Sequence, residues 1–278
     1  MRRSGFCPSA LPTQRKPMKI WYQSTLNFAH HPNYAKALAA HFKRVAGRDT
    51  EVVLNGRKTA FGSGLATHDV IGSPIMYHAI VAPAFVASVL AAEAAGADAF
   101  VVASFSEPIL PELRSLADIP VVSMPEACFM AAAMSAPRIG FVTLNRLVIP
   151  FIEKSIALHK WKDRVSGIHL IHGEISEAEL DTKFPEPGPY LDRLVSGARE
   201  AIAAGAQVVI PAEGVLGVMA AENGLREVDG VPVIDAIGTP ILVAELAVAL
   251  RQRTGVAQSR AAYRAPSSAA RALLAADH

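Results

Sequence analysis

The chain has 278 residues, of which 51% are apolar and 19% charged, and its formal net charge is only +2. This composition excludes an intrinsically disordered protein and is typical of a well-packed α/β protein with one large domain or two of ordinary size. Because much of the basic excess lies near the two ends of the chain, the body offers no footprint for a phosphate backbone, and we expect no nucleic-acid partner.

Cysteine content and hydropathy narrow the class of protein further. Cys7 and Cys128 are too few for a disulfide framework or a metal cluster, which favours the cytoplasm. The longest apolar run, residues 79–92, is broken by Pro83 and ends at Glu93. It is shorter than the roughly 20 residues of a membrane-spanning helix, so we expect no membrane segment.

In the first half of the chain, apolar runs alternate with segments of helical spacing. Residues 1–17 carry charges without a continuous apolar core, so we expect a disordered N-terminal extension, with Met18 as an alternative start. The expected strands are 19–24, 50–56, 99–104 and 120–124, and the expected helices are 32–47, 80–96, 111–119 and 123–134. Residues 57–78 are rich in glycine and polar residues and predict a long irregular loop.

The second half of the chain repeats this order of elements. The expected strands are 138–144, 167–173, 207–213 and 231–239, and the expected helices are 146–160, 189–204, one from about 215 and one from Pro240. Residues 256–278 have little to bury and predict a loose tail or a short surface helix. Strand–helix alternation of this kind predicts parallel sheets with helices on both faces.

The repeat also places two polar residues at equivalent positions. Gly96 and Gly205 are 109 residues apart, and so are Ser104 and Glu213, each of which follows the carboxyl end of an expected strand. Ligands of open parallel sheets bind at such strand ends. We therefore expect two pseudo-symmetric lobes, residues 18–122 plus 236–255 and residues 123–235, with Ser104 and Glu213 on opposite walls of one cleft.

Four motifs carry a resemblance to a known family. They are "GADAFVVASFSEP", "GAQVVIPAEG", "IPVVSMPEA" and "VPVIDAIGT". In order and spacing they resemble the two catalytic strand ends, and the elements after them, of the aspartate/glutamate/hydantoin racemase superfamily, over about residues 18–252 and nearest the hydantoin racemase branch. The resemblance implies a cofactor-independent enzyme with a small-molecule substrate and no metal.

The family's catalytic positions are changed in this chain. In the family both strand ends normally carry cysteines, one of which removes a proton from the substrate carbon while the other returns one. Here Ser104 stands at the first position and Glu213 at the second. Neither Cys7, in the extension, nor Cys128, inside an expected helix as a buried inert thiol, replaces them.

Three functional hypotheses follow from this change. In the first, Glu213 is a single general base and acid and Ser104 is its counterpart, which gives racemase- or isomerase-like proton transfer, or lyase and decarboxylase chemistry on one face. In the second, Ser104 is a nucleophile activated by Glu213 or a histidine, as in a hydrolase. In the third, the cleft binds a small acid without catalysis.

Further site residues are carried over from the resemblance. The candidate substrate-binding residues follow the strands of both lobes: Gln23, Ser24, Thr25, Phe105, Ser106, Thr143, Asn145, Gly214 and Val215. Further candidates are His30 and His31, expected at the mouth of the cleft, and Tyr77 and His78, in a loop that could close over it. The alternative is that several of these residues simply cap the next helix, which is the role expected for Ser123, Glu126 and Asp235. The alanine-rich helices favour a homo-oligomer.

Overall fold

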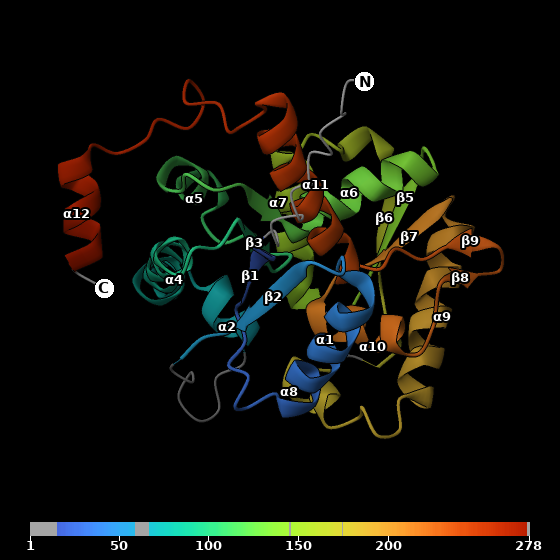
Figure 1. Cartoon of the computed structure of the whole chain (residues 1–278). Helices are drawn as coiled ribbons and strands as arrows, with labels where there is room; N and C mark the ends of the chain where they lie inside the picture. Colours follow the sequence, from blue (N-terminus) through green and yellow to red (C-terminus); the bar gives the residue numbers. More distant parts are fainter. Residues whose placement is uncertain (1–15, 59–66, 145, 174, 277–278) are drawn as a thin grey trace, which may run out of the picture.

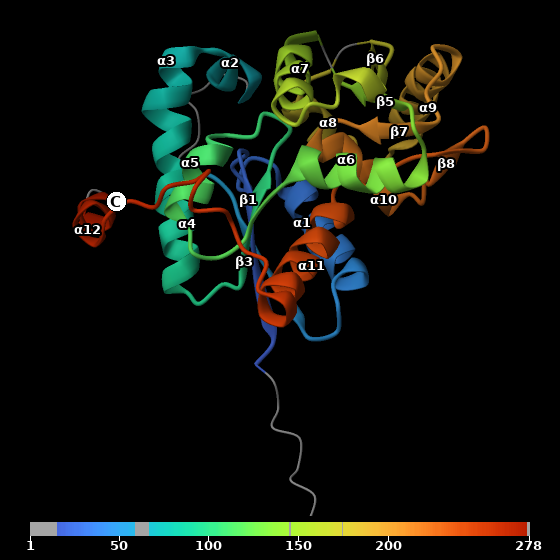
Figure 2. The ribbon, with the colours of Figure 1, turned by 90° about the horizontal axis from the view of Figure 1, so that it is seen from above.

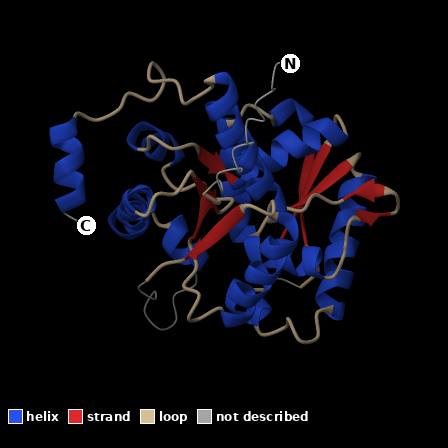
Figure 3. Cartoon of the chain, viewed as in Figure 1, coloured by secondary structure: helices blue, strands red, loops and turns tan. Residues whose placement is uncertain are grey.

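Two parallel β-sheets lie side by side and are flanked by helices in the computed structural model (Figures 1 and 3). The structure describes residues 16–58, 67–144, 146–173 and 175–276. Most of the expected N-terminal extension, residues 1–15, and the candidate site residue Asn145 therefore lie outside the described residues. The predicted α/β fold with helix-flanked parallel sheets is confirmed.

The first sheet has the strand order β2-β1-β3-β4, with every pair parallel. Its strands are β1 (Met18–Ser24), β2 (Thr50–Asn55), β3 (Ala99–Ala103) and β4 (Val121–Ser123). The helices of this part are α1 (Pro32–Val45), α2 (Thr67–Gly72), α3 (Pro74–Met76), α4 (Ala82–Ala94), α5 (Leu110–Leu116), α11 (Gly238–Thr254) and α12 (Ser268–Ala276). All residues of β3 are buried, as expected for an apolar run covered on both faces.

The second sheet repeats the order of the first. Its strands run β6-β5-β7, and a parallel bridge between Val209 and Val233 occupies the position that β4 has in the first sheet. They are β5 (Ile139–Thr143), β6 (Val165–Leu170) and β7 (Val208–Pro211), followed by the hairpin β8 (Glu227–Val228) and β9 (Val231–Pro232). The helices are α6 (Met124–Ser135), α7 (Ile149–Leu158), α8 (Glu177–Asp181), α9 (Gly188–Ala203) and α10 (Gly214–Glu222).

The expected strand 231–239 is shorter in the structure than the sequence pattern predicts. In this segment, strand pairing is limited to Val231 and Pro232 in the hairpin and to Val233 in its bridge with Val209. Helix α11 then begins at Gly238. Asp235 explains the early end, because its carboxylate accepts hydrogen bonds from the backbone amides of Ile237 and Gly238. These amides start the helix instead of continuing the ladder.

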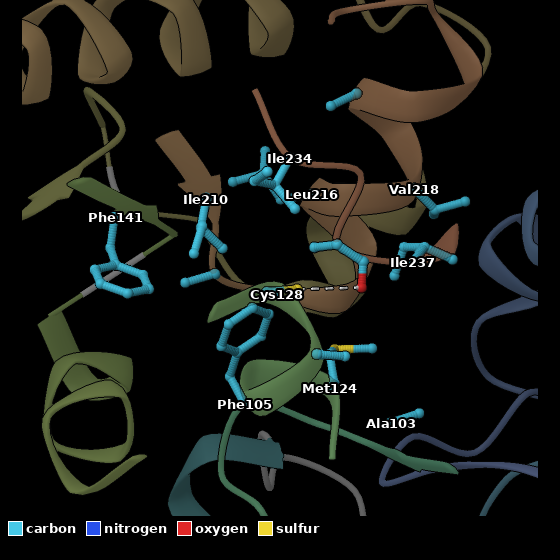
Figure 4. Packing of buried hydrophobic residues seen from close by; sticks show 14 of the residues in the cluster. Ala103, Phe105, Met124, Cys128, Phe141, Ile210, Leu216, Val218, Ile234 and Ile237 are labelled. Carbon is cyan, nitrogen blue, oxygen red and sulfur yellow. Dashed lines mark hydrogen bonds between the residues drawn. The ribbon is translucent and has the colours of Figure 1, made fainter. Parts of the chain in front are cut away.

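One hydrophobic core connects the two sheets through α6 and α11. Phe129 of α6 packs edge-on against Phe141 of β5, with ring centroids 5.8 Å apart. Cys128 is fully buried in this core, and the dashed line in Figure 4 marks the 3.9 Å contact between its sulfur and the carbonyl oxygen of Ala236. Burial, with the charge of Asp235, raises the pKa of the Cys128 thiol well above its ordinary value, which fits the predicted inert thiol.

The prediction of an irregular loop over residues 57–78 is wrong for the second part of this segment. Residues 59–66 lie outside the described residues, but α2, α3 and a π-helical turn (Tyr77–Val81) make the chain helical from Thr67 to α4. Val70 and Ile71 are buried in the cluster that also contains Phe85 and Val89 of α4. Burial of these side chains outweighs the glycine and polar content of the segment.

The helical stretch Pro74–Ala94 is long and apolar enough, by length and composition, to cross a membrane, with a mean hydropathy of 1.9. This differs from the sequence analysis, in which Pro83 was expected to break the apolar run. Proline is tolerated there because it lies in the first turn of α4. Of this window 28% is buried, and Phe85, Val89 and Ala92 belong to the cluster that also contains Phe100 and Val102 of β3.

In the C-terminal segment, Ser268–Ala276 form the surface helix α12, and residues 255–267 before it are irregular. The guanidinium of Arg260 donates to the carbonyl oxygens of Arg114, Ser115 and Ala117, at 3.2, 3.1 and 2.8 Å. Arg271 of α12 donates to the carbonyl of Leu116. These arginines satisfy the last carbonyls of α5, so the segment is tied to the first lobe, where α12 lies beyond α4 (Figure 2).

We predict that Asp235→Ala destabilises the protein by about 1–2 kcal/mol at pH 7, because the hydrogen bonds from the amides of Ile237 and Gly238 at the start of α11 are lost together with the 2.8 Å hydrogen bond to His41. Burial opposes ionisation of Asp235, but the hydrogen bonds from His41 and two backbone amides lower its pKa overall. The carboxylate therefore stabilises the fold above the ordinary value of 3.8, and this contribution is lost as the pH falls below it.

Urea unfolding of wild type and Asp235→Ala at pH 7 and pH 3 measures this difference. It should shrink at pH 3, whereas Asp192→Ala, at an exposed position of α9, should match wild type at both values. An equal difference at the two pH values would contradict the assigned role of the carboxylate.

Candidate active site

A small cavity of about 50 Å³ lies at the carboxyl ends of β1, β3 and β7. Its walls come from the ends of β1 and β3, the segment after β7, and the helices α1, α2, α7, α8 and α10. The lining residues are Ser24, Thr25, Leu26, Tyr34, Ile71, Ala103, Ser104, Phe105, Ser106, Val148, Phe151, Glu177, Ala212, Glu213 and Gly214. Ser104 and Glu213, which the sequence repeat predicts to share one cleft, therefore line the same cavity.

Ser104 follows directly after β3 and is partly exposed. Its hydroxyl lies 2.8 Å from that of Ser106 and accepts a longer hydrogen bond, 3.3 Å, from the Ser106 backbone amide. Among the described residues, no histidine lines this cavity. Within the described residues, the Ser104 hydroxyl is therefore hydrogen-bonded to Ser106 and to no general base.

Glu213 follows β7 and is the N-cap of α10. One of its carboxylate oxygens accepts the backbone amide of Leu216 at 2.7 Å. Burial raises the pKa of Glu213 to about 8, the charge of Glu177 adds to the rise, and the amides of Leu216, Val215 and Gly214 oppose it. A carboxyl group with this pKa holds its proton over most of the neutral range and is suited to both acid and base catalysis.

Tyr34 of α1 reaches across to the strand end that carries Glu213. Its hydroxyl lies 3.4 Å from the hydroxyl of Tyr22 and so close to Gly214 that a Cβ atom there would lie 2.7 Å from the oxygen. Only glycine at position 214 allows this approach. Sequence reasoning missed Tyr34, because a tyrosine in an amphipathic helix has the pattern of an ordinary core residue.

Glu177 is a second carboxylate in the cavity that sequence reasoning missed. It is the first residue of α8 and is only 7% exposed. Ser176 caps this short helix by accepting the amide of Glu179 at 3.2 Å. The sequence Ser-Glu-Ala-Glu has the spacing of a capping box, which could have predicted the helix but not where it packs.

The candidate substrate-binding residues separate into two groups in the structure. Ser24, Thr25, Phe105, Ser106 and Gly214 line the cavity. The structure places Gln23, Thr143 and Val215 in buried positions outside the lining residues.

Gln23 and Thr143, two of the residues outside the cavity lining, differ in their hydrogen bonding. Gln23 accepts a hydrogen bond of 2.5 Å from the side-chain amide of Asn55 and therefore links β1 to β2. The hydroxyl of Thr143 is buried, without a hydrogen-bond partner among the described residues. Their roles in binding remain predictions.

The residues expected at the mouth of the cleft lie in other places. His30 is exposed, and the ring of His31 is hydrogen-bonded to the carbonyl of Asn27 at 3.0 Å. Tyr77 and His78 line a second cavity of about 400 Å³. This second cavity adjoins the first, because both are lined by Ile71, Ser106 and Phe151.

Comparisons with known proteins identify similar sequences and folds. Residues 67–246, well over half of the chain, match the family model described as Asp/Glu/Hydantoin racemase. Hydantoin racemases from Pseudomonas sp. (strain NS671) and Rhizobium meliloti are 28% and 25% identical to it, over 62% and 60% of this chain and 67% of each relative.

Solved structures show the same fold at lower identity. The allantoin racemase from Klebsiella pneumoniae superposes with a TM-score of 0.73 at 22% identity, over 90% of this chain and 94% of that one. The allantoin racemase from Pseudomonas fluorescens gives 0.73 at 23%, over 90% and 97%. The matched segment includes both Ser104 and Glu213.

We predict that Gly214→Ala destabilises the protein by about 1–3 kcal/mol, because the new methyl group would overlap the Tyr34 hydroxyl. In the Tyr34→Phe background the cost should be smaller, since the nearest remaining atom is a ring carbon at 3.5 Å. Thermal unfolding of the four proteins in this double-mutant cycle measures the coupling. Gly188→Ala, where nothing lies within 4 Å, is the matched control, and additive effects would contradict the contact.

A second prediction concerns the proton on Glu213. Because its pKa is about 8 in the folded chain against an ordinary 4.5, unfolding releases a proton between these values, and the wild type loses stability as the pH rises through this window. Glu213→Gln removes that loss, so its stability relative to wild type should increase from pH 5 to pH 8.5 by on the order of a few kcal/mol. Denaturant titrations at both pH values measure it, and a difference independent of pH would contradict the shift.

Proposed function

The chain belongs to the Asp/Glu/hydantoin racemase family, and from this premise we propose that it racemises or isomerises a small carboxylate or cyclic amide by proton transfer at carbon. The observation that carries the proposal is Glu213, a carboxyl group with a pKa of about 8 in the cavity that Ser104 also lines. A proton donor and acceptor near neutral pH is what such a reaction requires.

In the proposed reaction Glu213 is the general base and acid. Its carboxylate takes the proton from the substrate carbon, the electron pair of the C–H bond moves into the neighbouring carbonyl group, and return of a proton to carbon completes the cycle. Ser104 acts from the β3 side as hydrogen-bond donor or relay. Ser24 and Thr25, at the end of β1, are proposed to hold the substrate's carboxylate or carbonyl oxygen.

The substitution of the two family cysteines favours one-sided chemistry as the second candidate. Ser104 is a far weaker base than Glu213, so proton removal and return from the Glu213 side supports double-bond migration or decarboxylation of a similar substrate. The hydrolase hypothesis has less support, because among the described residues the Ser104 hydroxyl is hydrogen-bonded to Ser106 and not to a histidine or to Glu213. Binding of a small acid without catalysis is the outcome if no proton exchange is found.

The chain itself supplies the acid–base group, so we propose catalysis without a cofactor. Among the described residues, no group of three or more histidine, cysteine, aspartate or glutamate side chains is arranged to hold a metal ion. We also propose a cytoplasmic homo-oligomer with the lobe boundaries near residues 123 and 236, in keeping with its two cysteines and alanine-rich helices.

We predict C–H exchange in deuterated water with at least one compound from a panel of hydantoins, amino acids and substituted malonates. Proton NMR measures loss of the signal, and chiral chromatography measures inversion. Glu213→Gln should lower the exchange rate at least about 100-fold, because the base is removed. Ser104→Ala should lower inversion more than exchange, and Glu179→Gln, an exposed glutamate on α8, should match wild type.

The same measurement separates the other hypotheses. Full exchange activity in Glu213→Gln would contradict the proposal. Binding without exchange or product would indicate a small-acid binding protein, and ring or ester cleavage that is lost in Ser104→Ala would indicate a hydrolase.

A further inference from the structure

The segment between β3 and α5 has an unusual backbone. Glu107 and Ile109 have positive φ angles of 45° and 43°, in the left-handed region that residues other than glycine rarely adopt. Ser104, Phe105 and Ser106, directly before them, line the cavity. A strained backbone of this kind persists only where surrounding contacts hold it, and it is common near functional sites.

The carboxylate of Glu107 receives hydrogen bonds from outside its own segment. Ring atom Nε2 of His159 donates to Oε1 at 2.6 Å, and the hydroxyl of Ser123 donates to the same oxygen. Glu107 is only 4% exposed, and the ring of His159 packs edge-on against Phe129, with centroids 5.8 Å apart. The other ring nitrogen of His159 lies 3.6 Å from a carboxylate oxygen of Glu126. The pair of Glu107 and His159 is therefore enclosed and held from several sides.

A second hydrogen bond to the segment comes from the same face of α7. The hydroxyl of Ser155, which is buried, donates to the carbonyl oxygen of Phe105 at 3.0 Å. Ser155 lies four positions before His159, at the C-cap of α7, and four positions after Phe151, which lines the cavity. Residues at this spacing share one face of a helix. One face of α7 therefore forms part of the cavity wall and also holds the segment that carries Ser104.

We propose that Ser155 and His159 are positioning residues, which hold the segment after β3 so that the hydroxyls of Ser104 and Ser106 stay at the cavity wall. The inference rests on the proposed function and deepens it, because it names the residues that set the Ser104 side of the reaction. Neither Ser155 nor His159 is among the described residues that line the cavity. Each acts through the group that it holds, which is the Phe105 carbonyl for Ser155 and the Glu107 carboxylate for His159.

The direction of these hydrogen bonds explains the arrangement better than a contribution to stability does. Burial removes the hydration of the Glu107 and His159 side chains, and an apolar pair of similar size often stabilises a protein interior equally well. A hydrogen bond of 2.6 Å instead fixes the distance and direction of the Glu107 carboxylate relative to α7. It requires a proton only on Nε2, which both the neutral ring and the imidazolium can carry, so the contact forms with His159 in either state.

Amide hydrogen exchange of the ligand-free protein, followed by NMR, tests the holding contacts without a substrate. The Glu107 amide donates to the Ser104 carbonyl at 3.2 Å, and the Ser106 amide donates to the Ser104 hydroxyl at 3.3 Å. Both amides should exchange at least about 10-fold faster in His159→Leu and in Ser155→Ala, which remove the donors. His159→Gln, whose side-chain amide can donate in place of Nε2, should restore most of the protection.

The same variants test the role of α7 in the reaction. With a compound that shows C–H exchange in wild type, kcat should fall at least about 10-fold in His159→Leu and Ser155→Ala while KM stays within about 3-fold, because only the Ser104 wall is displaced. His159→Gln should recover most of kcat, whereas a residue that only packs would tolerate leucine better than glutamine. His172→Leu is the matched control and should match wild type, because His172 pairs with Glu200 on the surface, at 2.8 Å.

Unchanged amide protection in His159→Leu or in Ser155→Ala would overturn the role of the residue concerned, and so would faster amide exchange with the kcat of wild type. Equal losses in His159→Leu and His159→Gln would overturn the hydrogen-bonding role of His159. If His159→Leu does not fold, Ser155→Ala decides, since it removes a single hydroxyl. Failure of the proposed function is distinguishable, because it appears as full C–H exchange in Glu213→Gln or as none in wild type, while the amide measurements still decide whether α7 holds the segment.

Discussion

The site depends on a carboxyl group that the fold keeps away from bulk water at the start of a helix. Removal of Glu213 from water favours its protonated form, and the backbone amides of α10 favour the ionised form. Because the first effect is larger, the pKa of Glu213 is raised to about 8. A glutamate on an exposed loop would be ionised at neutral pH, so it would hold no proton to donate, and its carboxylate would be a weaker base.

This balance requires the two lobes to enclose the cavity tightly. Tyr34 from the first lobe lies against Gly214 from the second, and Asp181 from the second lobe caps the helix that carries Tyr34. In the first contact a side chain of the first lobe reaches the second lobe, and in the other contact a side chain of the second lobe reaches the first. Loosening either one would admit water beside Glu213 and shift its protonation towards that of an ordinary glutamate.

The part of the site that could be predicted from sequence is the part that the internal repeat encodes. The 109-residue offset matches β3 with β7, and Ser104 and Glu213 line one cavity as expected. Parallel strands place their carboxyl ends at one edge, so spacing alone is sufficient for this inference. The buried thiol of Cys128 and the Ser123 cap, which accepts the Glu126 amide at 3.1 Å, also follow from local pattern.

The remaining features depend on contacts between distant segments, which periodicity does not encode. Glu177 reaches the cavity because α8 packs on α1. The hydrogen bonds between these helices join Asp181 to Tyr34 and Asn33, which are separated from it by 147 and 148 positions in the sequence. Residues 67–81 are helical because Val70 and Ile71 find apolar partners on α4, although their own segment predicts a loop. In both cases tertiary burial decides the structure, and the local sequence gives little indication of it.

The central claim is that Ser104 and Glu213 act on the same carbon atom from the β3 and β7 sides of one cavity. Its most direct test is a crystal structure with a bound planar analogue of the deprotonated substrate, such as an unsaturated ring carboxylate. We expect the trigonal carbon of the analogue to lie between the Ser104 hydroxyl and the Glu213 carboxyl group, within hydrogen-bond distance of both. The account would be contradicted by an analogue that binds only in the neighbouring cavity beside Tyr77 and His78. Neither Ser104 nor Glu213 would then contact a ligand atom.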